Sequence, residues 1–351
     1  MTAEMKAAVL TGRQQIEIQT LPIPEVTAGS ILLKILACGV CGSDIRIFNN
    51  GHSRVAYPAI TGHEIAAEVV EVGAGVTRFK VGDRLSLGAD VPCGQCEWCQ
   101  NGLGNCCEQN FAIGHQFPGG FAQYCLLSPI TVQYGPLRAV PDGVDMELAA
   151  LAEPLACCIN GLERVNFAPG RSAVILGAGP IGIMLAQAAR AFGSPLVILS
   201  DIDPERLRMA RVSGADCYFN ATGDELVSQV MDTTGGRGAD VVFTACPSPD
   251  AQEDALRIVG TRGAVNLFGG LPGSARPIQL LSNLIHYKEI TLTGSHGSTP
   301  RQHALAVDLI ASGRINLSGL ITHHFALDDI RQAFQTVEDR HGLKVMILPN
   351  N

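Results

Sequence analysis

The stretch SAVILGAGPIGIMLAQAARAFGSPLVILSDIDP, residues 172–204, decides the fold of this chain. It begins with the apolar run 173–176, which is too short to be anything but a buried strand. The glycine-rich turn 177–182 follows and leads into the helix-forming segment 183–192. A second apolar run, 196–199, predicts a second strand. In this strand–turn–helix–strand order, G-x-G-x-x-G indicates a dinucleotide-binding unit.

Each residue of the turn has an expected role in holding the cofactor. Gly177 permits the tight turn, Gly179 lets the backbone approach a pyrophosphate, and Gly182 lets the helix pack on the strand. Pro180 and Ile181 open the helix, where unpaired N–H groups and the positive end of the helix dipole point at one spot. We therefore expect these five residues to contact the cofactor's phosphates.

Asp201 ends the second predicted strand, 19 residues after Gly182. A carboxylate there can accept hydrogen bonds from a ribose diol and would repel a 2′-phosphate, so the unit predicts NAD rather than NADP. Arg206 could add a contact to the adenosine ribose, although a solvated charge on the next helix explains it equally well. Gly269, at the end of a later predicted strand, and His296 complete the expected cofactor contacts.

Length and charge exclude several classes of protein. At 351 residues the chain is too long for one ordinary core, so two domains are expected. The net charge of −8 argues against nucleic acid and anionic membrane surfaces as partners. Neither a membrane-spanning apolar run nor an N-terminal secretory signal is evident, so a cytoplasmic protein is expected.

A group of the twelve cysteines is spaced as C-x2-C-x2-C-x7-C, at positions Cys93, Cys96, Cys99 and Cys107. Four thiolates suit tetrahedral zinc, and the short segment that carries them has little apolar sequence to hold it folded. A site closed by four sulfurs leaves no position for substrate, so its expected role is structural. Cys106 competes with Cys107 for the fourth place.

Three further motifs carry side chains that can bind a metal, namely Cys41-Gly42-Ser43-Asp44, Gly62-His63-Glu64 and Glu153-Pro154. Taken singly, they also suit a buried thiol, a core histidine and a solvated acid. Together with the cysteine segment, the glycine-rich turn and Asp201, they follow the order seen in medium-chain zinc-dependent alcohol and polyol dehydrogenases. The chain resembles this family over nearly its whole length. It resembles the sorbitol and threonine dehydrogenase branch most, because Glu153 stands where other members carry a third-ligand cysteine.

The resemblance implies a catalytic zinc bound by Cys41 and His63. Glu153 would complete the protein ligands, directly or through water, and Glu64 would be the alternate ligand. Ser43 would take the hydroxyl proton of the substrate and pass it to solvent. Zinc with an open position would lower the pKa of that hydroxyl, and NAD would accept hydride from the carbinol carbon.

The resemblance also favours Cys107 over Cys106 in the structural site, which implies about two zinc ions per chain. The implied fold is α/β, with a doubly wound parallel Rossmann sheet and a β-rich GroES-like catalytic domain. The expected boundaries are 1–155 for the first catalytic part, with the zinc lobe at 90–110, 156–295 for the Rossmann domain and 296–351 for the returning catalytic part. Family members pair through the edge strand, here residues 290–293, so a homodimer or homotetramer is expected.

The implied reaction is NAD-dependent oxidation of a secondary alcohol in a polyol, sugar alcohol or cyclitol. Two departures from the family leave the substrate open: Ile45-Arg46 replaces a relay histidine, for which His52 could substitute, and the segment 294–298 lacks an arginine that sorbitol dehydrogenases use. A threonine-type amino alcohol dehydrogenase is the alternative enzyme. A non-catalytic NAD-binding sensor and a zinc-free reductase of the same fold are the alternatives from other classes.

Overall fold

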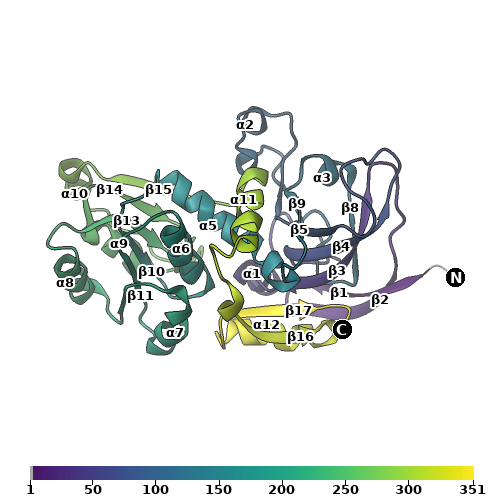
Figure 1. Ribbon diagram of the computed structural model, residues 1–351. Coiled ribbons are helices and arrows are strands. Elements are labelled where there is room, and N and C mark those ends of the chain that lie inside the picture. Colours follow the sequence, from purple (N-terminus) through teal and green to yellow (C-terminus); the bar gives the residue numbers. More distant parts are fainter. Residues whose placement is uncertain (1–2) are drawn as a thin grey trace. The chain divides into compact units, whose positions relative to one another are not determined.

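The computed structural model describes residues 3–351 and divides the chain into two compact units, whose elements are labelled in Figure 1. The terminal unit comprises Met1–Ala156 and Gly297–Asn351, and the central unit comprises Cys157–His296. Helix α5 (Ala152–Arg164) runs across the first boundary. Within residues 3–351, none of the helices combines the length and the apolar character that a membrane span requires.

The central unit is built on a six-stranded parallel sheet with the order β12-β11-β10-β13-β14-β15. The strands are β10 (Ala173–Leu176), β11 (Val197–Ser200), β12 (Cys217–Phe219), β13 (Ala239–Thr244), β14 (Val259–Leu267) and β15 (Thr291–Gly294). The connecting helices are α6 (Pro180–Ala191), α7 (Pro204–Met209), η2 (Ala210–Ser213), α8 (Gly223–Thr233), α9 (Pro249–Ile258) and α10 (Ser282–Lys288). The order reverses between β10 and β13, and ligands of such sheets bind outside the carboxyl ends of the strands at this switch point. The predicted doubly wound sheet is confirmed.

The central strands of this sheet have no exposed face. Every residue of β10 and of β11 is buried. Helix α6 covers them with its apolar residues, from Ile183 to Ala189. This explains why both strands are short continuous apolar runs instead of alternating ones, as parallel sheets between helices require.

The terminal unit contains a seven-stranded sheet with the path β16-β17-β3-β4-β5-β9, and β8 also pairs with β3. Its strands are β3 (Ile31–Gly39), β4 (Glu64–Val72), β5 (Arg84–Leu87), β8 (Tyr124–Leu127), β9 (Leu137–Ala139), β16 (Ile321–Ala326) and β17 (Lys344–Leu348). Two hairpin-like pairs accompany it, β1 (Glu4–Gly12) with β2 (Gln15–Pro22) and β6 (Asp90–Val91) with β7 (Phe111–Ala112). The helical segments are α1 (Gly42–Asn50), α2 (Glu97–Gln100), η1 (Gly104–Cys106), α3 (Pro129–Tyr134), α4 (Met146–Ala150), α11 (Pro300–Ala311), η3 (Ser318–Leu320), η4 (Leu327–Asp329) and α12 (Ile330–Glu338).

One end of this sheet gathers chain segments that are distant in sequence. Strand β3 ends at Gly39, which pairs with Glu64 at the start of β4 and with Met346 near the start of β17. The segments that flank these strand ends therefore lie together, because adjacent antiparallel strands place the end of one beside the start of the next. Cys41, His63 and Lys344 all lie at this edge as a consequence.

His303 in α11 gives the terminal unit a pH-dependent stability. Its ring is fully buried, Nε2 lies 3.1 Å from Ser86 Oγ, and burial lowers its pKa to about 4 from 6.5. Between pH 6.5 and pH 4, His303 therefore binds a proton in the unfolded chain but not in the folded chain. We expect the free energy of unfolding of this unit to fall by about 3 kcal/mol as the pH drops from 6.5 to 4.

Denaturant unfolding at a series of pH values would measure this slope. A His303→Gln variant should show a flatter profile over the same interval, because glutamine does not titrate. A variant with the wild-type slope would show that another group causes the loss of stability.

Candidate functional site

A group of three ligand-bearing residues lies at the sheet edge of the terminal unit. The Sγ atom of Cys41, a ring nitrogen of His63 and a carboxylate oxygen of Glu64 all lie within 4.8 Å of one another. Cys41 is the N-cap residue of α1, and the other two stand where β4 begins. His63 and Glu64 are buried, while Cys41 is partly exposed. Sulfur, imidazole and carboxylate donors with one open side suit a catalytic zinc.

The carboxylate of Asp44 fixes the histidine of this group. It accepts hydrogen bonds from the N–H of Cys41 at 2.9 Å and of Gly62 at 3.2 Å, and it lies 3.5 Å from His63 Nδ1. Although burial opposes it, the charge of His63 lowers the pKa of Asp44. A carboxylate behind a metal-binding histidine sets the ring's orientation and raises its basicity. Ser43 Oγ lies 3.3 Å from the other ring nitrogen, Nε2.

The two carboxylate oxygens of Glu64 have different surroundings. Its Oε1 accepts a short hydrogen bond from Lys344 Nζ, which also donates to the carbonyl of Val40 at 3.1 Å. Its Oε2 is buried and has no hydrogen-bond partner. A buried, unpartnered carboxylate oxygen beside a thiol and an imidazole is costly unless a cation binds there. The residues present therefore fit a metal ion.

A glycine makes room for this carboxylate. A Cβ atom on Gly39 would lie 2.1 Å from Glu64 Oε2, so a larger residue would displace the oxygen. Sequence reasoning missed Gly39 and Lys344, and it named Asp44 only as part of a motif, without a role. Asp44 had a local signal, because it stands at the third position of a helix whose N-cap is Cys41. Gly39 and Lys344 had none, since only strand pairing brings them to Glu64.

Glu153 is the predicted ligand that the structure does not place in the group of three. It lies near the start of α5 and is buried. Burial raises the pKa of its carboxyl to about 7, with His63 and Lys344 opposing the shift and Glu64 adding to it. Glu153 belongs to the same compact unit as Cys41, His63 and Glu64. That Glu153 is the third ligand and Glu64 the alternate remains a prediction.

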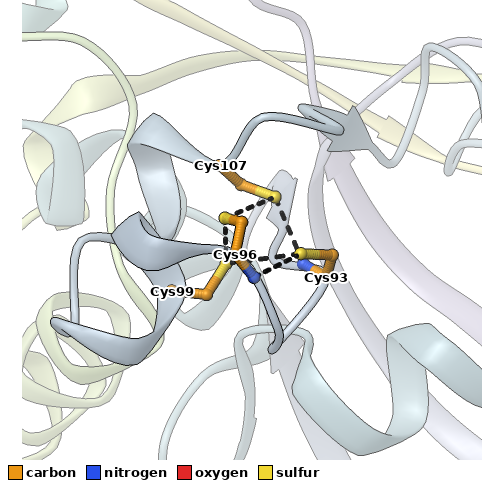
Figure 2. A group of neighbouring side chains, drawn as sticks. All are labelled: Cys93, Cys96, Cys99 and Cys107. Carbon is orange, nitrogen blue, oxygen red and sulfur yellow. Dashed lines mark hydrogen bonds between the residues drawn. The ribbon is translucent and has the colours of Figure 1, made fainter.

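The four predicted cysteines of the zinc lobe converge on one point, with their sulfurs facing one another (Figure 2). The Sγ atoms of Cys96 and Cys99 are 3.5 Å apart, those of Cys93 and Cys99 are 3.9 Å apart, and those of Cys96 and Cys107 are 4.0 Å apart. A tetrahedron with zinc–sulfur bonds of about 2.3 Å has sulfur–sulfur edges of about 3.8 Å. The spacing therefore fits a closed tetrahedral zinc site. Cys106 is exposed and lies outside the group.

Backbone N–H groups of the lobe favour the thiolate form of Cys93, whereas burial raises the pKa of Cys99 to about 12. Cys93 Sγ accepts hydrogen bonds from the N–H of Gln95 at 3.4 Å and of Cys96 at 3.3 Å, which lower its pKa to about 6. Cys107 Sγ accepts one from the N–H of Cys93 at 3.3 Å. Since thiolates are the form that binds zinc, these contacts prepare the site for the metal.

In the central unit, the glycine-rich turn has the geometry that its sequence predicts. Gly177 has a φ of +115°, a conformation that L side chains rarely adopt. A Cβ on Gly182 would lie 1.8 Å from the carbonyl oxygen of Gly177, so only glycine lets α6 pack this closely. Gly179 is the N-cap of α6, which Pro180 and Ile181 begin. The N–H groups of this helix start remain available to a phosphate.

The side chains of Asp201 and Arg206 both approach the glycine-rich turn. Asp201 Oδ2 accepts a hydrogen bond from the N–H of Ala178 at 2.7 Å, and Oδ1 accepts one from Asp203 at 3.0 Å. The Nη1 atom of Arg206 lies 3.0 Å from where a Cβ on Gly179 would stand. The carboxylate therefore braces the turn in addition to its expected contact with the ribose. That Asp201 and Arg206 contact the adenosine ribose remains a prediction.

The last two expected cofactor contacts follow strands of the same sheet. Gly269 comes after β14, and its N–H donates to the carbonyl of Thr244 at 2.7 Å. A Cβ there would lie 2.7 Å from the carbonyl oxygen of Cys246. His296 comes after β15, and its carbonyl accepts a hydrogen bond from Asn160 Nδ2 at 3.1 Å. Their contacts with the cofactor remain predictions.

An Asp201→Ser variant should relax the preference for NAD. Removing the carboxylate removes the repulsion of a 2′-phosphate and leaves Arg206 to pair with it, so the ratio of kcat/KM for NADP to that for NAD should rise about 100-fold. Initial rates with both coenzymes would measure the ratio. Serine also loses the contact with Ala178, so Asp201→Asn, which keeps an acceptor oxygen, is the matched control. An unchanged ratio in both variants would place the ribose contact elsewhere.

Comparisons with known proteins agree with this geometry. Residues 27–134 match the family model of the alcohol dehydrogenase GroES-like domain, and residues 180–312 match that of zinc-binding dehydrogenases. The chain is 34% identical to sorbitol dehydrogenase of Bacillus subtilis, over 99% of this chain and 98% of that protein. It is 33% identical to D-arabitol-phosphate dehydrogenase of Enterococcus avium, over 97% and 95% of the two chains. It also resembles the solved structure of an Escherichia coli alcohol dehydrogenase complexed with NADH, with a TM-score of 0.89, 26% identity and coverage of 99% and 100%.

Proposed function

Because this chain belongs to the medium-chain zinc-dependent alcohol and polyol dehydrogenases, we propose that it oxidises a secondary alcohol of a polyol or sugar-like substrate to the ketone, with hydride transfer to NAD. The observation that carries the proposal is the group of Cys41, His63 and Glu64, with its buried, unpartnered Glu64 oxygen. Sorbitol and D-arabitol phosphate, the substrates in the names of two relatives, are both polyols.

Each residue in and around the metal-binding group has its own role in the proposed reaction. Cys41, His63 and a carboxylate would hold a zinc ion, which would supply a Lewis acid to lower the pKa of a substrate hydroxyl. Asp44 holds the ring of His63 in one orientation, and Lys344 holds one oxygen of Glu64. Ser43 Oγ, which lies 3.3 Å from His63 Nε2, would accept the proton of the substrate alcohol and pass its own proton on toward solvent.

The rest of the chain supports this reaction. The four-cysteine lobe would hold a second zinc with a structural role, and Asp201 would favour NAD over NADP. Strand β15 is the last strand of its sheet, so it could pair with β15 of a second copy in a homodimer or homotetramer. We propose a cytoplasmic location, in which reduced cysteines persist.

The decisive experiment combines metal analysis with a substrate panel. The purified protein should contain about two zinc ions per chain. It should form NADH with at least one of sorbitol, galactitol and myo-inositol, and not with threonine or simple alcohols. Zinc without activity toward any alcohol would favour the sensor, absence of zinc would favour the zinc-free reductase, and activity confined to threonine would favour the amino alcohol dehydrogenase.

A further inference from the structure

Two histidines connect the metal-binding group to a set of basic side chains that the proposed chemistry does not use. The ring centroid of His115 lies 6.0 Å from that of His63, and the ring centroid of His52 lies 5.3 Å from that of His115. The backbone N–H of Arg54 donates to His52 Nδ1 at 3.1 Å. These residues all belong to the terminal unit, so the chain of contacts runs within one compact body.

The charges around His52 are positive. Burial lowers the pKa of His52, and the positive charges of Arg54 and Arg46 lower it further. The ring of His115 lies between those of His52 and His63, with its Nδ1 atom 3.4 Å from the carbonyl oxygen of Ile113. We call Arg46, His52, Arg54 and His115 the basic group.

The arginines of the basic group have no acidic partners. Across residues 3–351, no carboxylate forms an ion pair with Arg46 or Arg54. Arg54 donates from Nη1 to the carbonyl of Asn110 at 2.8 Å, which leaves its other donors free for a ligand. Arginines elsewhere, such as Arg138 and Arg276, are ion-paired with aspartate or glutamate. Two cations without a neutralising carboxylate create a local field that attracts an anion, although the net charge of the chain is −8.

We infer that the basic group recognises an oxyanion carried by the substrate, either a phosphate ester or a carboxylate, at some distance along the chain from the carbinol carbon. This inference rests on the proposed function, because it names the substrate class of the same site. The planar guanidinium of Arg54 can bind either oxyanion through two parallel hydrogen bonds, and the charge of Arg46 adds to the attraction. His115 is the member of the basic group that packs on His63, so its ring would contact hydroxyl groups of the substrate between the oxyanion and the carbinol carbon.

Three matched compounds test the inference, namely sorbitol, sorbitol 6-phosphate and gluconate. The kcat/KM for one of the two anionic compounds should exceed that for sorbitol by about tenfold to a hundredfold, the range that hydrogen bonds to a charged group supply. Which of the two is preferred distinguishes the phosphate ester from the carboxylate. Inorganic phosphate should inhibit competitively with the preferred substrate if that substrate is the phosphate ester.

An Arg54→Ala variant should reduce the preference of the anionic compound over sorbitol by about tenfold or more, and Arg54→Lys should keep part of it. The matched control is Arg314→Ala, which replaces an exposed arginine of the same unit, and thermal unfolding would confirm that each variant is folded.

Equal activity toward sorbitol and both anionic compounds would overturn the inference and leave the proposed function standing. A raised KM for NAD with an unchanged preference would also overturn it, because the basic group would then serve the coenzyme. Failure to oxidise any compound of either panel would instead overturn the proposed function.

Discussion

A Cys41→Ser variant is expected to lose one of two zinc ions and to lower kcat/KM by about 10³-fold or more. A metal ion contributes several kcal/mol of charge stabilisation to the transition state, and each 1.4 kcal/mol corresponds to about a tenfold change in rate. The hydroxyl of serine is a poor replacement for a thiolate ligand. Zinc analysis and initial rates of NADH formation would measure both losses.

The choice of serine separates loss of the metal from loss of the fold. Cys41 is the N-cap of α1, and serine is among the preferred residues at that position, so the helix should persist. An Asp44→Asn variant should have a smaller effect, a loss of about 10- to 100-fold in metal affinity or activity, because it acts through the orientation of His63. Full zinc content and full activity in Cys41→Ser would show that the thiol of Cys41 is not a ligand of the catalytic zinc.

The two carboxylates can be told apart in the same way. Glu64→Gln and Glu153→Gln each keep the shape of the side chain and remove its charge. The variant of the direct third ligand should bind less zinc at the catalytic site, and the other should keep its zinc. The structure groups Glu64 with Cys41 and His63, whereas the family resemblance favours Glu153 as the third ligand. The zinc contents of the two variants therefore decide which carboxylate is the ligand.

A Cys96→Ser variant is expected to lose the other zinc ion and to lower the free energy of unfolding of the terminal unit by several kcal/mol. Between residues 93 and 107, only Gly104 and Cys107 are buried, so this lobe has almost no apolar core of its own. The zinc–sulfur bonds would supply the stability that packing does not. Cys96 is the N-cap of α2, where serine is again well tolerated. The loss of stability in this variant should therefore come from the loss of the zinc ion.

Cys106→Ser is the matched control for this variant. Cys106 neighbours Cys107 in sequence but is exposed and lies outside the group of four sulfurs. Its replacement should change neither the zinc content nor the denaturant midpoint. Loss of zinc in Cys106→Ser but not in Cys107→Ser would reverse the assignment of the fourth ligand.

Some features of this protein follow from local sequence alone. The glycine-rich turn and its flanking apolar runs specify a strand–turn–helix unit, because Gly177 must have a positive φ and Gly182 must lack a side chain. The four cysteines of the lobe converge because they lie within fifteen residues of one another, from Cys93 to Cys107, and short loops hold them close. Spacing along the chain carries this information, so no knowledge of distant contacts is needed.

The metal-binding group of the terminal unit depends on distant contacts instead. Cys41 and Glu64 meet because β3 ends where β4 begins, and Lys344 joins them because β17 pairs with β3 from the other end of the chain. No spacing rule predicts which of two buried carboxylates faces the thiol and the imidazole, or that Gly39 must leave room for it. The sequence by itself therefore determined the nucleotide-binding turn and the cysteine lobe, whose residues are neighbours in the chain. Only the tertiary structure shows that Glu64 faces Cys41 and His63 and that Lys344 contacts it, because strand pairing between remote segments places those side chains together.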